Sequence, residues 1–207
     1  DQKSPTLGIK PNPKTNSNRI LSNKAVELIF NPNEKSTIYY TFDLSDPDLS
    51  SPKIDLSECN QRLVVIGNET LKVTAYDQAG NKSAPLVREI IIDREPPILG
   101  SIEVDDSDQL INISRVNLIL SAEGASKVSI LENINQFNSQ QMIPYKNTLE
   151  YQLQDASDGE KILYAVFSDD AGNLFGPNGE ASTSFTLDQT SPPNNQIQLL
   201  NQTICQL

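Results

Sequence analysis

The sequence lacks histidine and tryptophan altogether among its 207 residues. Without histidine it has neither the commonest general base and metal ligand nor an imidazole that would activate a serine or cysteine nucleophile. Without tryptophan it lacks the usual stacking platform of sugar-binding sites, although six tyrosines and six phenylalanines remain. The 27 acidic residues fall mainly in expected turns and at strand ends, so no carboxylate pair indicates glycoside hydrolysis. The sequence therefore predicts a protein without a catalytic site.

Basic residues are few. The sequence has 16 lysines and arginines against 27 acidic residues, which gives a formal net charge of −11. A nucleic-acid partner needs a basic face that neutralises phosphates, and no cluster of lysine or arginine supplies one. An acidic surface suits either bound cations or solubility, and solubility is the simpler interpretation. We therefore expect no nucleic-acid partner.

Long apolar runs are also missing, and the longest include residues 63–66 and 90–92. A membrane-spanning helix needs about 20 apolar residues, so no membrane insertion of this segment is expected. Residues 1–5 open without an apolar stretch. For a secreted parent protein, a secretion signal would therefore lie upstream or have been removed.

Only two cysteines are present, Cys59 and Cys205, and neither has the spacing of a metal site. A disulfide between them would link different structural units. Two unpaired thiols are the favoured interpretation, and the bridge remains the alternative.

The chain repeats itself at a spacing of 92 residues. Residues 5–8 (Pro-Thr-Leu-Gly) match residues 97–100 (Pro-Ile-Leu-Gly), and residues 77–81 (Asp-Gln-Ala-Gly-Asn) match residues 169–173 (Asp-Asp-Ala-Gly-Asn). Such self-similarity is typical of tandem structural units. Each unit closes with an aspartate and then a proline pair, which stops the last strand and stiffens the connection.

The repeat predicts one domain over residues 1–94 and a second over residues 95–190. Residues 191–207 resemble the opening of a third repeat, and the alternative is a C-terminal tail that packs on the second domain.

Inside each unit the apolar residues recur with a period of two, which is typical of half-buried β-strands. Turn-forming clusters separate these short segments, and no helical stripe extends over three turns. About seven short strands in a unit of roughly ninety residues indicate an immunoglobulin-like sandwich. We therefore predict an all-β fold of two tandem immunoglobulin-like β-sandwich domains arranged as a rod. Alternation is clear in this set: Leu71, Val73, Ala75, Leu163, Ala165 and Phe167.

Residues 36–47, 51–52 and 70–77 resemble the chitobiase/β-hexosaminidase C-terminal-type domain, over a span of about residues 24–93. The resemblance implies a non-catalytic immunoglobulin-like module. The sequence departs from that family at Leu44, where the family prefers glycine.

Residues 158–173 and 185–188 resemble bacterial immunoglobulin-like repeats. Such repeats form strings on adhesins and serve as spacers in secreted glycan-degrading enzymes. The resemblance transfers the fold better than the function, because one sandwich hosts many roles.

The two Asp-x-Ala-Gly-Asn segments are explained as hairpin turns. The aspartate caps the turn, and the glycine and asparagine tolerate left-handed backbone. A cation site is the alternative, but calcium takes about six to eight oxygen ligands, more than one aspartate and one asparagine provide.

Calcium at the domain junctions is the one cofactor hypothesis. Asp93 and Asp188 lie at the two junctions, and Asp93 would combine with Glu95 and with Asp105, Asp106 or Asp108 of the next unit. Solvated loop charge is the simpler interpretation, and no cofactor is otherwise expected.

The aromatic residues of the first unit suggest a candidate ligand site. Strand alternation places Tyr40 and Phe42 in the core and Tyr39 on the opposite face. Tyr39 and Tyr76 would then be exposed, and such a pair would stack on sugar rings. Scattered surface tyrosines are the simpler interpretation.

These observations predict a structural or binding module of an extracellular bacterial surface protein or adhesin. Its partners would be neighbouring repeats of the same chain and a protein or glycan on a host or neighbouring cell. The alternative is an accessory region of a secreted glycan-degrading enzyme.

Overall fold

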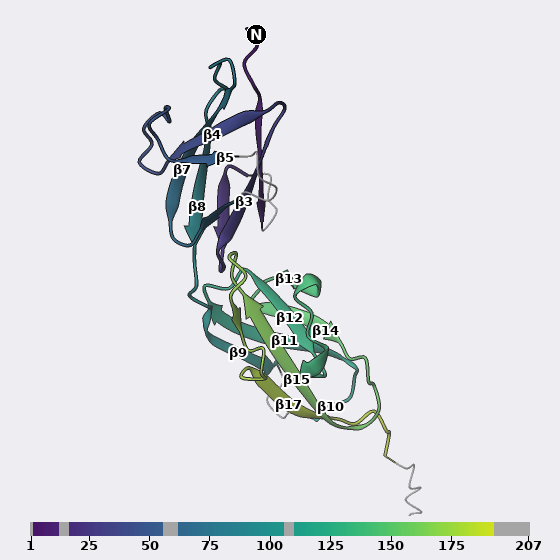
Figure 1. Cartoon of the computed structure of the whole chain (residues 1–207). Helices are drawn as coiled ribbons and strands as arrows, with labels where there is room; N and C mark the ends of the chain where they lie inside the picture. The colour runs from purple at the N-terminus through teal and green to yellow at the C-terminus, as the bar shows by residue number, and fades with distance from the viewer. Residues whose placement is uncertain (1, 13–16, 56–61, 106–109, 193–207) are drawn as a thin grey trace, which may run out of the picture.

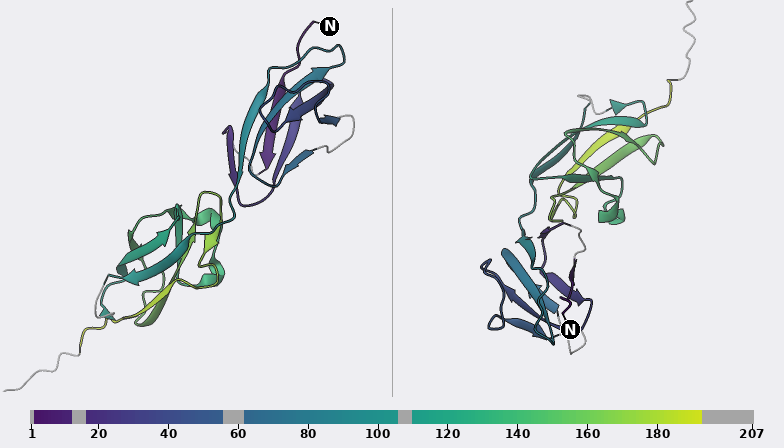
Figure 2. Two further views of the ribbon diagram at one scale, coloured as in Figure 1. Left: turned by 90° about the vertical axis from the view of Figure 1, so that its left-hand side faces the viewer. Right: turned by 90° about the horizontal axis from the view of Figure 1, so that it is seen from above.

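The computed structural model describes residues 2–12, 17–55, 62–105 and 110–192. These residues form two β-sandwiches that lie end to end along the long axis of the molecule (Figure 1). Two further views show the same arrangement of the two units (Figure 2). The expected all-β fold of tandem immunoglobulin-like sandwiches is thereby confirmed. Within the described residues, no helix has the length and apolar character needed to cross a bilayer.

In the first sandwich, a three-stranded sheet of order β1-β3-β6 packs against a five-stranded sheet of order β2-β8-β7-β4-β5. Antiparallel pairing holds both sheets together, except that β2 runs parallel to β8. The strands are β1 (Leu7–Asn12), β2 (Arg19–Ser22), β3 (Val26–Pro32), β4 (Ser36–Thr41), β5 (Lys53–Asp55), β6 (Arg62–Val65), β7 (Glu69–Asp77) and β8 (Leu86–Ile92).

In the second sandwich, a sheet of order β14-β11-β9 packs against a sheet of order β10-β17-β15-β12-β13. The short strand β16 adds to β15, and two 3-10 segments follow β12. The strands are β9 (Ile98–Val104), β10 (Leu110–Ile111), β11 (Arg115–Glu123), β12 (Lys127–Leu131), β13 (Ile143–Pro144), β14 (Thr148–Gln152), β15 (Gly159–Ser168), β16 (Leu174–Phe175) and β17 (Ser182–Leu187), and the 3-10 segments are η1 (Ile134–Gln136) and η2 (Ser139–Gln141).

The two sandwiches share one strand order. The first, third and sixth main strands form the smaller sheet of each, and β10 runs parallel to β17 as β2 runs parallel to β8. Even β16 has a counterpart, because Leu174 pairs with Ser168 as Lys82 bridges to Tyr76. The sequence repeat therefore corresponds to a structural repeat, in which β9 matches β1 and β15 matches β7.

Each sandwich has its own apolar core, filled from both sheets. Side chains that alternate along β3 and β7 point inward in the first sandwich, and those along β11 and β15 do so in the second. Burying such a side chain fully contributes about 1.5–3 kcal/mol, so the alternation accounts for the sandwich. The following core residues are inaccessible to solvent: Val26, Leu28, Ile38, Leu71, Val73, Leu118, Leu163, Phe167 and Leu187.

Phe42 departs from the sequence expectation. Tyr40 packs against the first core as predicted, but Phe42 is 38% exposed and contacts the Tyr40 ring edge-on at a centroid distance of 5.5 Å. The reason is that β4 ends at Thr41, so the alternation that would turn Phe42 inward stops one residue earlier.

Candidate functional site

The junction between the two sandwiches is built on the turn at residues 169–173, called here the second-repeat turn. The Asp169 carboxylate accepts hydrogen bonds from the backbone N–H of Gly172 at 2.7 Å and of Asn173 at 2.8 Å. Gly172 has a φ of 92°, a left-handed conformation that costs glycine little. The aspartate and the glycine therefore shape this turn locally, as the sequence predicted.

The same turn contacts the first sandwich. The backbone N–H of Asn23 donates to the Ala171 carbonyl at 3.2 Å, and the Asn23 side-chain amide donates to the Gly172 carbonyl at 2.9 Å. Ala171 is only 8% exposed and lines a pocket with Ser22 and Lys24 of the first sandwich. We call this the junction pocket; it is also lined by Asn12, Ala25, Glu27 and Val64.

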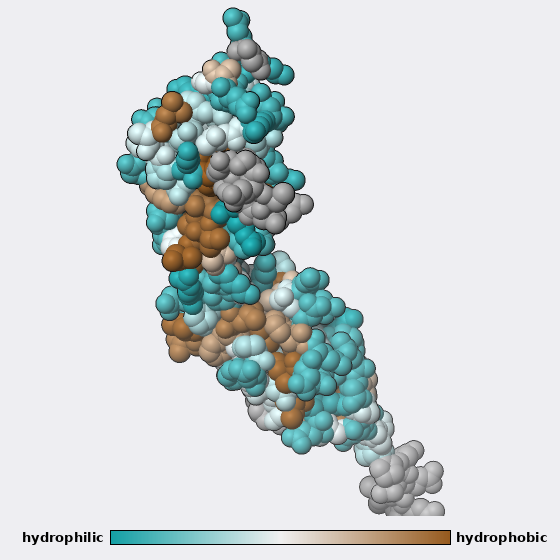
Figure 3. Space-filling view, in the orientation of Figure 1, coloured by the Kyte–Doolittle hydropathy of each residue, from teal (hydrophilic) through white to brown (hydrophobic). Residues whose placement is uncertain are grey.

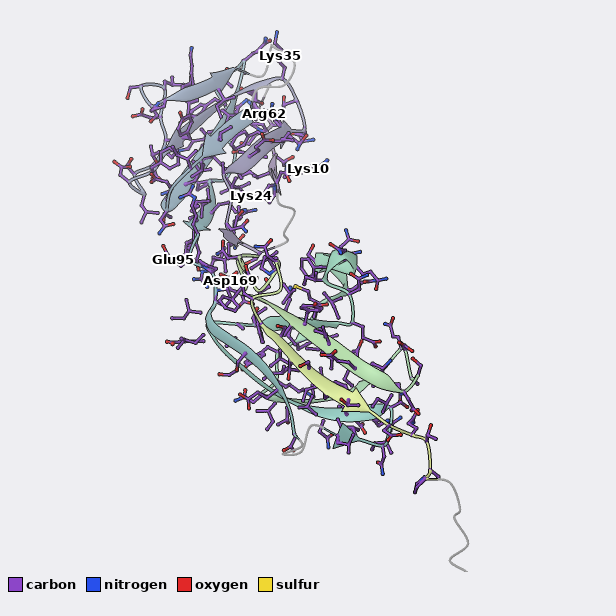
Figure 4. All side chains as sticks on the ribbon, turned by 90° about the horizontal axis from the view of Figure 1, so that it is seen from below. Lys10, Lys24, Lys35, Arg62, Glu95 and Asp169 are labelled. Atoms are coloured by element: carbon purple, nitrogen blue, oxygen red, sulfur yellow. The ribbon has the colours of Figure 1, made fainter. Side chains whose placement is uncertain are left out.

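The linker between the sandwiches is fixed by the second-repeat turn. Asn173 is buried, and its side-chain amide donates to the backbone carbonyls of Asp93 at 3.0 Å and Glu95 at 3.2 Å. The same amide also donates to Asp169 at 2.8 Å. Figure 4 labels Glu95 and Asp169, which lie close to each other at the junction. A single asparagine thus ties the turn to the backbone of the connecting segment.

The first sandwich fixes the linker from the other side. The Asp93 N–H donates to the Ser22 carbonyl at 3.0 Å, which extends the β2–β8 pairing by one residue. The Arg94 guanidinium donates to the Ile66 carbonyl at 3.1 Å, and the Asp93 carboxylate accepts from the Glu95 N–H at 3.0 Å. Pro96 and Pro97 then restrict the backbone before β9 begins.

These contacts favour one relative orientation of the sandwiches. Each intramolecular hydrogen bond contributes about 0.5–1.5 kcal/mol net. Contacts from the turn to Asn23 and to the linker act in addition to two prolines. Apolar surface lies on both sandwiches beside the junction, separated by a hydrophilic band (Figure 3). The contacts thus connect the second-repeat turn to the first sandwich and to the linker backbone.

The calcium candidates are distributed over both ends of the second sandwich. Asp93 and Glu95 lie at the junction, whereas Asp105 and Asp188 line one pocket at the opposite end of that sandwich. Strand β9 lies between Asp93 and Asp105 in the chain, and its seven residues span roughly 20 Å. Asp106 and Asp108 lie outside the described residues. Among the residues that are described, no group of three or more metal-ligating side chains comes together, and the calcium site stays a prediction.

Tyr39 and Tyr76 do lie side by side on neighbouring strands β4 and β7. Their rings meet edge to face with centroids 5.4 Å apart, and both side chains are half-buried. The Tyr76 hydroxyl donates to the Pro47 carbonyl at 3.4 Å. The pair is therefore a structural contact on the outer face of the larger sheet, and its binding of sugar rings stays a prediction.

Cys59 and Cys205 lie outside the described residues, so the choice between free thiols and a disulfide stays open. The predicted third repeat or tail falls there as well, apart from Ser191 and Pro192.

Sequence reasoning missed Asn23 and the role of Ala171. It explained the aspartate, glycine and asparagine of the turn by backbone geometry, and left the alanine without a purpose. An alanine that recurs at the same turn position in both repeats was the available signal, because turn geometry does not require it. Nothing in the sequence marked Asn23, whose partner lies 149 residues away.

Comparison with known proteins agrees with an immunoglobulin- or fibronectin III-like module. Residues 26–90 match a family model described as Fn3 associated. That match supports such a domain in the first sandwich, and the narrower chitobiase-type resemblance remains a prediction. No protein of curated function matches the sequence.

The solved structures that match the chain have low sequence identity to it. The fibronectin(III)-like modules of Clostridium thermocellum CbhA are 12% identical, with a TM-score of 0.49 and coverage of 87% of this chain and 93% of that chain. A tetra-tandem repeat from the extending region of a large adhesion protein is 13% identical, with a TM-score of 0.33 and coverage of 90% and 50%. The D00-D0 domain of intimin is 10% identical, with a TM-score of 0.29 and coverage of 87% and 100%. Domains of the fibronectin III and immunoglobulin kind are generally non-catalytic.

Proposed function

We propose that the chain is a semi-rigid spacer of an extracellular bacterial surface protein or adhesin, which holds a binding surface away from its anchoring point. The observation that carries the proposal is the docked junction. Ala171 is buried against the first sandwich, and Asn173 holds the linker backbone. A spacer needs an orientation that persists, and these contacts favour one orientation.

The bacterial and extracellular setting rests on the sequence of the second repeat. Residues 158–173 resemble the bacterial immunoglobulin-like repeats that occur on cell surfaces. The acidic composition suits an exposed rod that stays soluble. The partner of the displayed surface would be a protein or glycan on a host or neighbouring cell, contacted by loops or by a sheet face.

The junction is tested by measuring whether the two sandwiches tumble as one body. Residual dipolar couplings of the full chain should fit a single alignment tensor for both sandwiches. Ala171→Arg places a long charged side chain where an alanine is buried, so each sandwich should then require its own tensor. Ala79→Arg is the matched control, because Ala79 has the same place in the first-repeat turn, residues 77–81, and is exposed. Independent alignment of the wild-type sandwiches would contradict the spacer proposal.

The surface setting needs a separate test. A secretion signal and a wall anchor in the same reading frame would support the surface protein or adhesin. A domain with a pair of catalytic carboxylates in that frame would instead make the sandwiches accessories of a secreted glycan-degrading enzyme.

A further inference from the structure

The turn that docks at the junction has a preformed copy in the first sandwich. In the first-repeat turn, the Asp77 carboxylate accepts from the Asn81 N–H at 2.8 Å and from the Asn81 side-chain amide at 2.8 Å. The equivalent bonds in the second-repeat turn, from Asn173 to Asp169, have the same lengths. Gly80 has a φ of 88° and Gly172 one of 92°. The two turns therefore have the same shape.

Within the part of the chain that the structure describes, the alanine is covered in the second-repeat turn alone. Ala171 is 8% exposed, whereas Ala79 at the equivalent position is exposed, as are Gln78 and Gly80 beside it. The first-repeat turn thus has the shape that the second-repeat turn uses for docking, but its alanine is exposed.

The surface that receives the turn also occurs twice. The far end of the second sandwich carries a pocket lined by the end of β9, by β10 and by the start of β11. The junction pocket is lined by the end of β1, the end of β2 and the start of β3, the equivalent elements of the first sandwich. We call the pocket at the far end of the second sandwich the end pocket; its lining includes Leu110, Ile111, Asn112, Ile113 and Asp188.

One backbone hydrogen bond sets the residue correspondence between the pockets. The Asp93 N–H donates to the Ser22 carbonyl at 3.0 Å, and the Asp188 N–H donates to the Ile111 carbonyl at 2.8 Å. The residue after each acceptor is an asparagine, so Asn112 corresponds to Asn23.

Asn112 lacks the contacts that Asn23 makes. It is exposed, and neither its backbone N–H nor its side-chain amide donates to any residue that the structure describes. Asn23 donates from both groups to the second-repeat turn. The end pocket therefore presents the same two donors in an unused state.

Two apolar side chains of the end pocket also lack cover. Leu110 is 59% exposed and Ile113 is 58% exposed. Their counterparts beside the junction pocket are Leu21, which is half-buried, and Lys24. Covering two exposed aliphatic side chains would favour docking through the hydrophobic effect.

The linker that follows the end pocket has the same design as the linker at the junction. The Asp188 carboxylate accepts from the Thr190 N–H at 3.1 Å, as the Asp93 carboxylate accepts from the Glu95 N–H at 3.0 Å. Residues 188–192 read Asp-Gln-Thr-Ser-Pro, and residues 1–5 read Asp-Gln-Lys-Ser-Pro. The segment that leaves the second sandwich therefore has nearly the same sequence as the segment that enters the first sandwich.

We propose that the end pocket binds the Asp-x-Ala-Gly-Asn turn of another β-sandwich repeat, joined to it through the linker after Asp188. The alanine of the incoming turn lies in the pocket as Ala171 does at the junction. Its carbonyl and that of the following glycine accept from Asn112. The inference rests on the proposed spacer function, because it takes the observed junction as the repeating contact of a longer rod.

The test is a head-to-tail fusion in which residues 1–187 are followed directly by a second full chain. Asp1 of the second copy then takes the place of Asp188, and the first-repeat turn of that copy can reach the end pocket of the first copy. The readout is hydrogen exchange of the Asn112 amide in the first copy. Exchange should slow at least about tenfold relative to the unfused chain, because this N–H gains an acceptor.

Variants of the fusion identify the contact. Ala79→Arg in the second copy should restore fast exchange at Asn112 of the first copy. Ala171→Arg in the second copy is the matched control and should leave that protection intact. The unfused Ala79→Arg chain should keep its Asn23 amide protected, which shows that the variant folds.

The outcomes separate this inference from the spacer proposal. If Asn23 stays protected and Asn112 exchanges as fast as in the unfused chain, the end pocket does not bind a repeat, and the spacer proposal stands. If Asn23 is itself unprotected in the wild-type chain, the observed junction does not persist, and the proposed function fails first.

Discussion

Ala79 and Ala171 occupy the same position in two copies of one turn, yet Ala79 is exposed and Ala171 is 8% exposed. The difference arises outside the turns, because among the described residues a second sandwich lies against the second-repeat turn and not against the first-repeat turn. Each alanine is thus a natural control for the other.

Asn23→Ala should loosen the junction without unfolding either sandwich. It removes the side-chain hydrogen bond to the Gly172 carbonyl, a contact of about 0.5–1.5 kcal/mol. The backbone N–H of residue 23 is protected only while the turn is docked, so its hydrogen exchange should accelerate about two- to tenfold. Asn112→Ala, at the equivalent exposed position, should leave this rate unchanged. Equal effects of the two substitutions would contradict the assigned contact.

Asp155→Asn should destabilise the second sandwich at neutral pH. The Lys161 side chain is 8% exposed, and its ammonium donates to the Asp155 carboxylate at 2.7 Å. This hydrogen bond holds the pKa of Asp155 well below its usual range. Removing the carboxylate leaves a buried ammonium without its charged partner, which lowers the free energy of unfolding.

The effect should depend on pH in a defined direction. Because folding lowers the pKa of Asp155, its stabilisation is fully present above the ordinary carboxyl pKa of about 4. It is lost as the pH falls through the lower, folded-state pKa. The gap in thermal midpoint between wild type and Asp155→Asn should therefore be constant near neutrality and shrink below about pH 4. Glu160→Gln is the control, since Glu160 is exposed on the same strand; a gap that widens in acid would refute the assignment.

Gly100→Ala should destabilise the second sandwich by about 1–3 kcal/mol, the usual cost of overpacking. A β-carbon at Gly100 would lie 2.3 Å from the Phe175 ring and 3.1 Å from the Phe167 ring. Gly8 is the repeat equivalent, and its nearest neighbour would be a backbone oxygen at 3.5 Å. Gly8→Ala should therefore be neutral or stabilise by a few tenths of a kcal/mol. Urea unfolding followed through resonances of each sandwich measures both changes, and similar losses would contradict the packing argument.

Leu44→Gly should raise stability although it removes an aliphatic side chain. Leu44 has a φ of 65° and is 56% exposed. Left-handed backbone costs a non-glycine residue about 1–2 kcal/mol, which exceeds the loss of about 0.5–1 kcal/mol that glycine brings through unfolded-state entropy. Leu49 is 69% exposed with an ordinary φ, so Leu49→Gly should lower stability. Thermal unfolding of the two variants should shift in opposite directions, and a shared loss would show that Leu44 is not strained.

Leu44 lies where the chitobiase-type family prefers glycine, and its backbone conformation explains that preference. The chitobiase-type resemblance expects glycine there, and the backbone does adopt the left-handed conformation that favours glycine. The sequence thus marked the position, whereas only the structure shows that leucine retains the turn.

Much of the fold followed from local signals. Period-two alternation identified strands such as β7 and β15, and the spacing of 92 residues identified the repeat. Phe42 was misplaced because alternation does not report where a strand ends. The contact between Asn23 and the second-repeat turn was beyond sequence reasoning, since it joins residues far apart and uses backbone carbonyls that every residue has.

The parallel pairing of β2 with β8 has a mechanical consequence. Residues 19–22 pair in register with residues 89–92, immediately before the linker, and β10 pairs with β17 in the same sense. A pulling force along the chain draws the two partners of such a pair past each other. Their hydrogen bonds are then loaded in shear, all at once, whereas strands peeled apart from one end break theirs in succession. Under such a force, each sandwich would resist extension through this parallel strand pair, which lies at the end from which the chain leaves the sandwich.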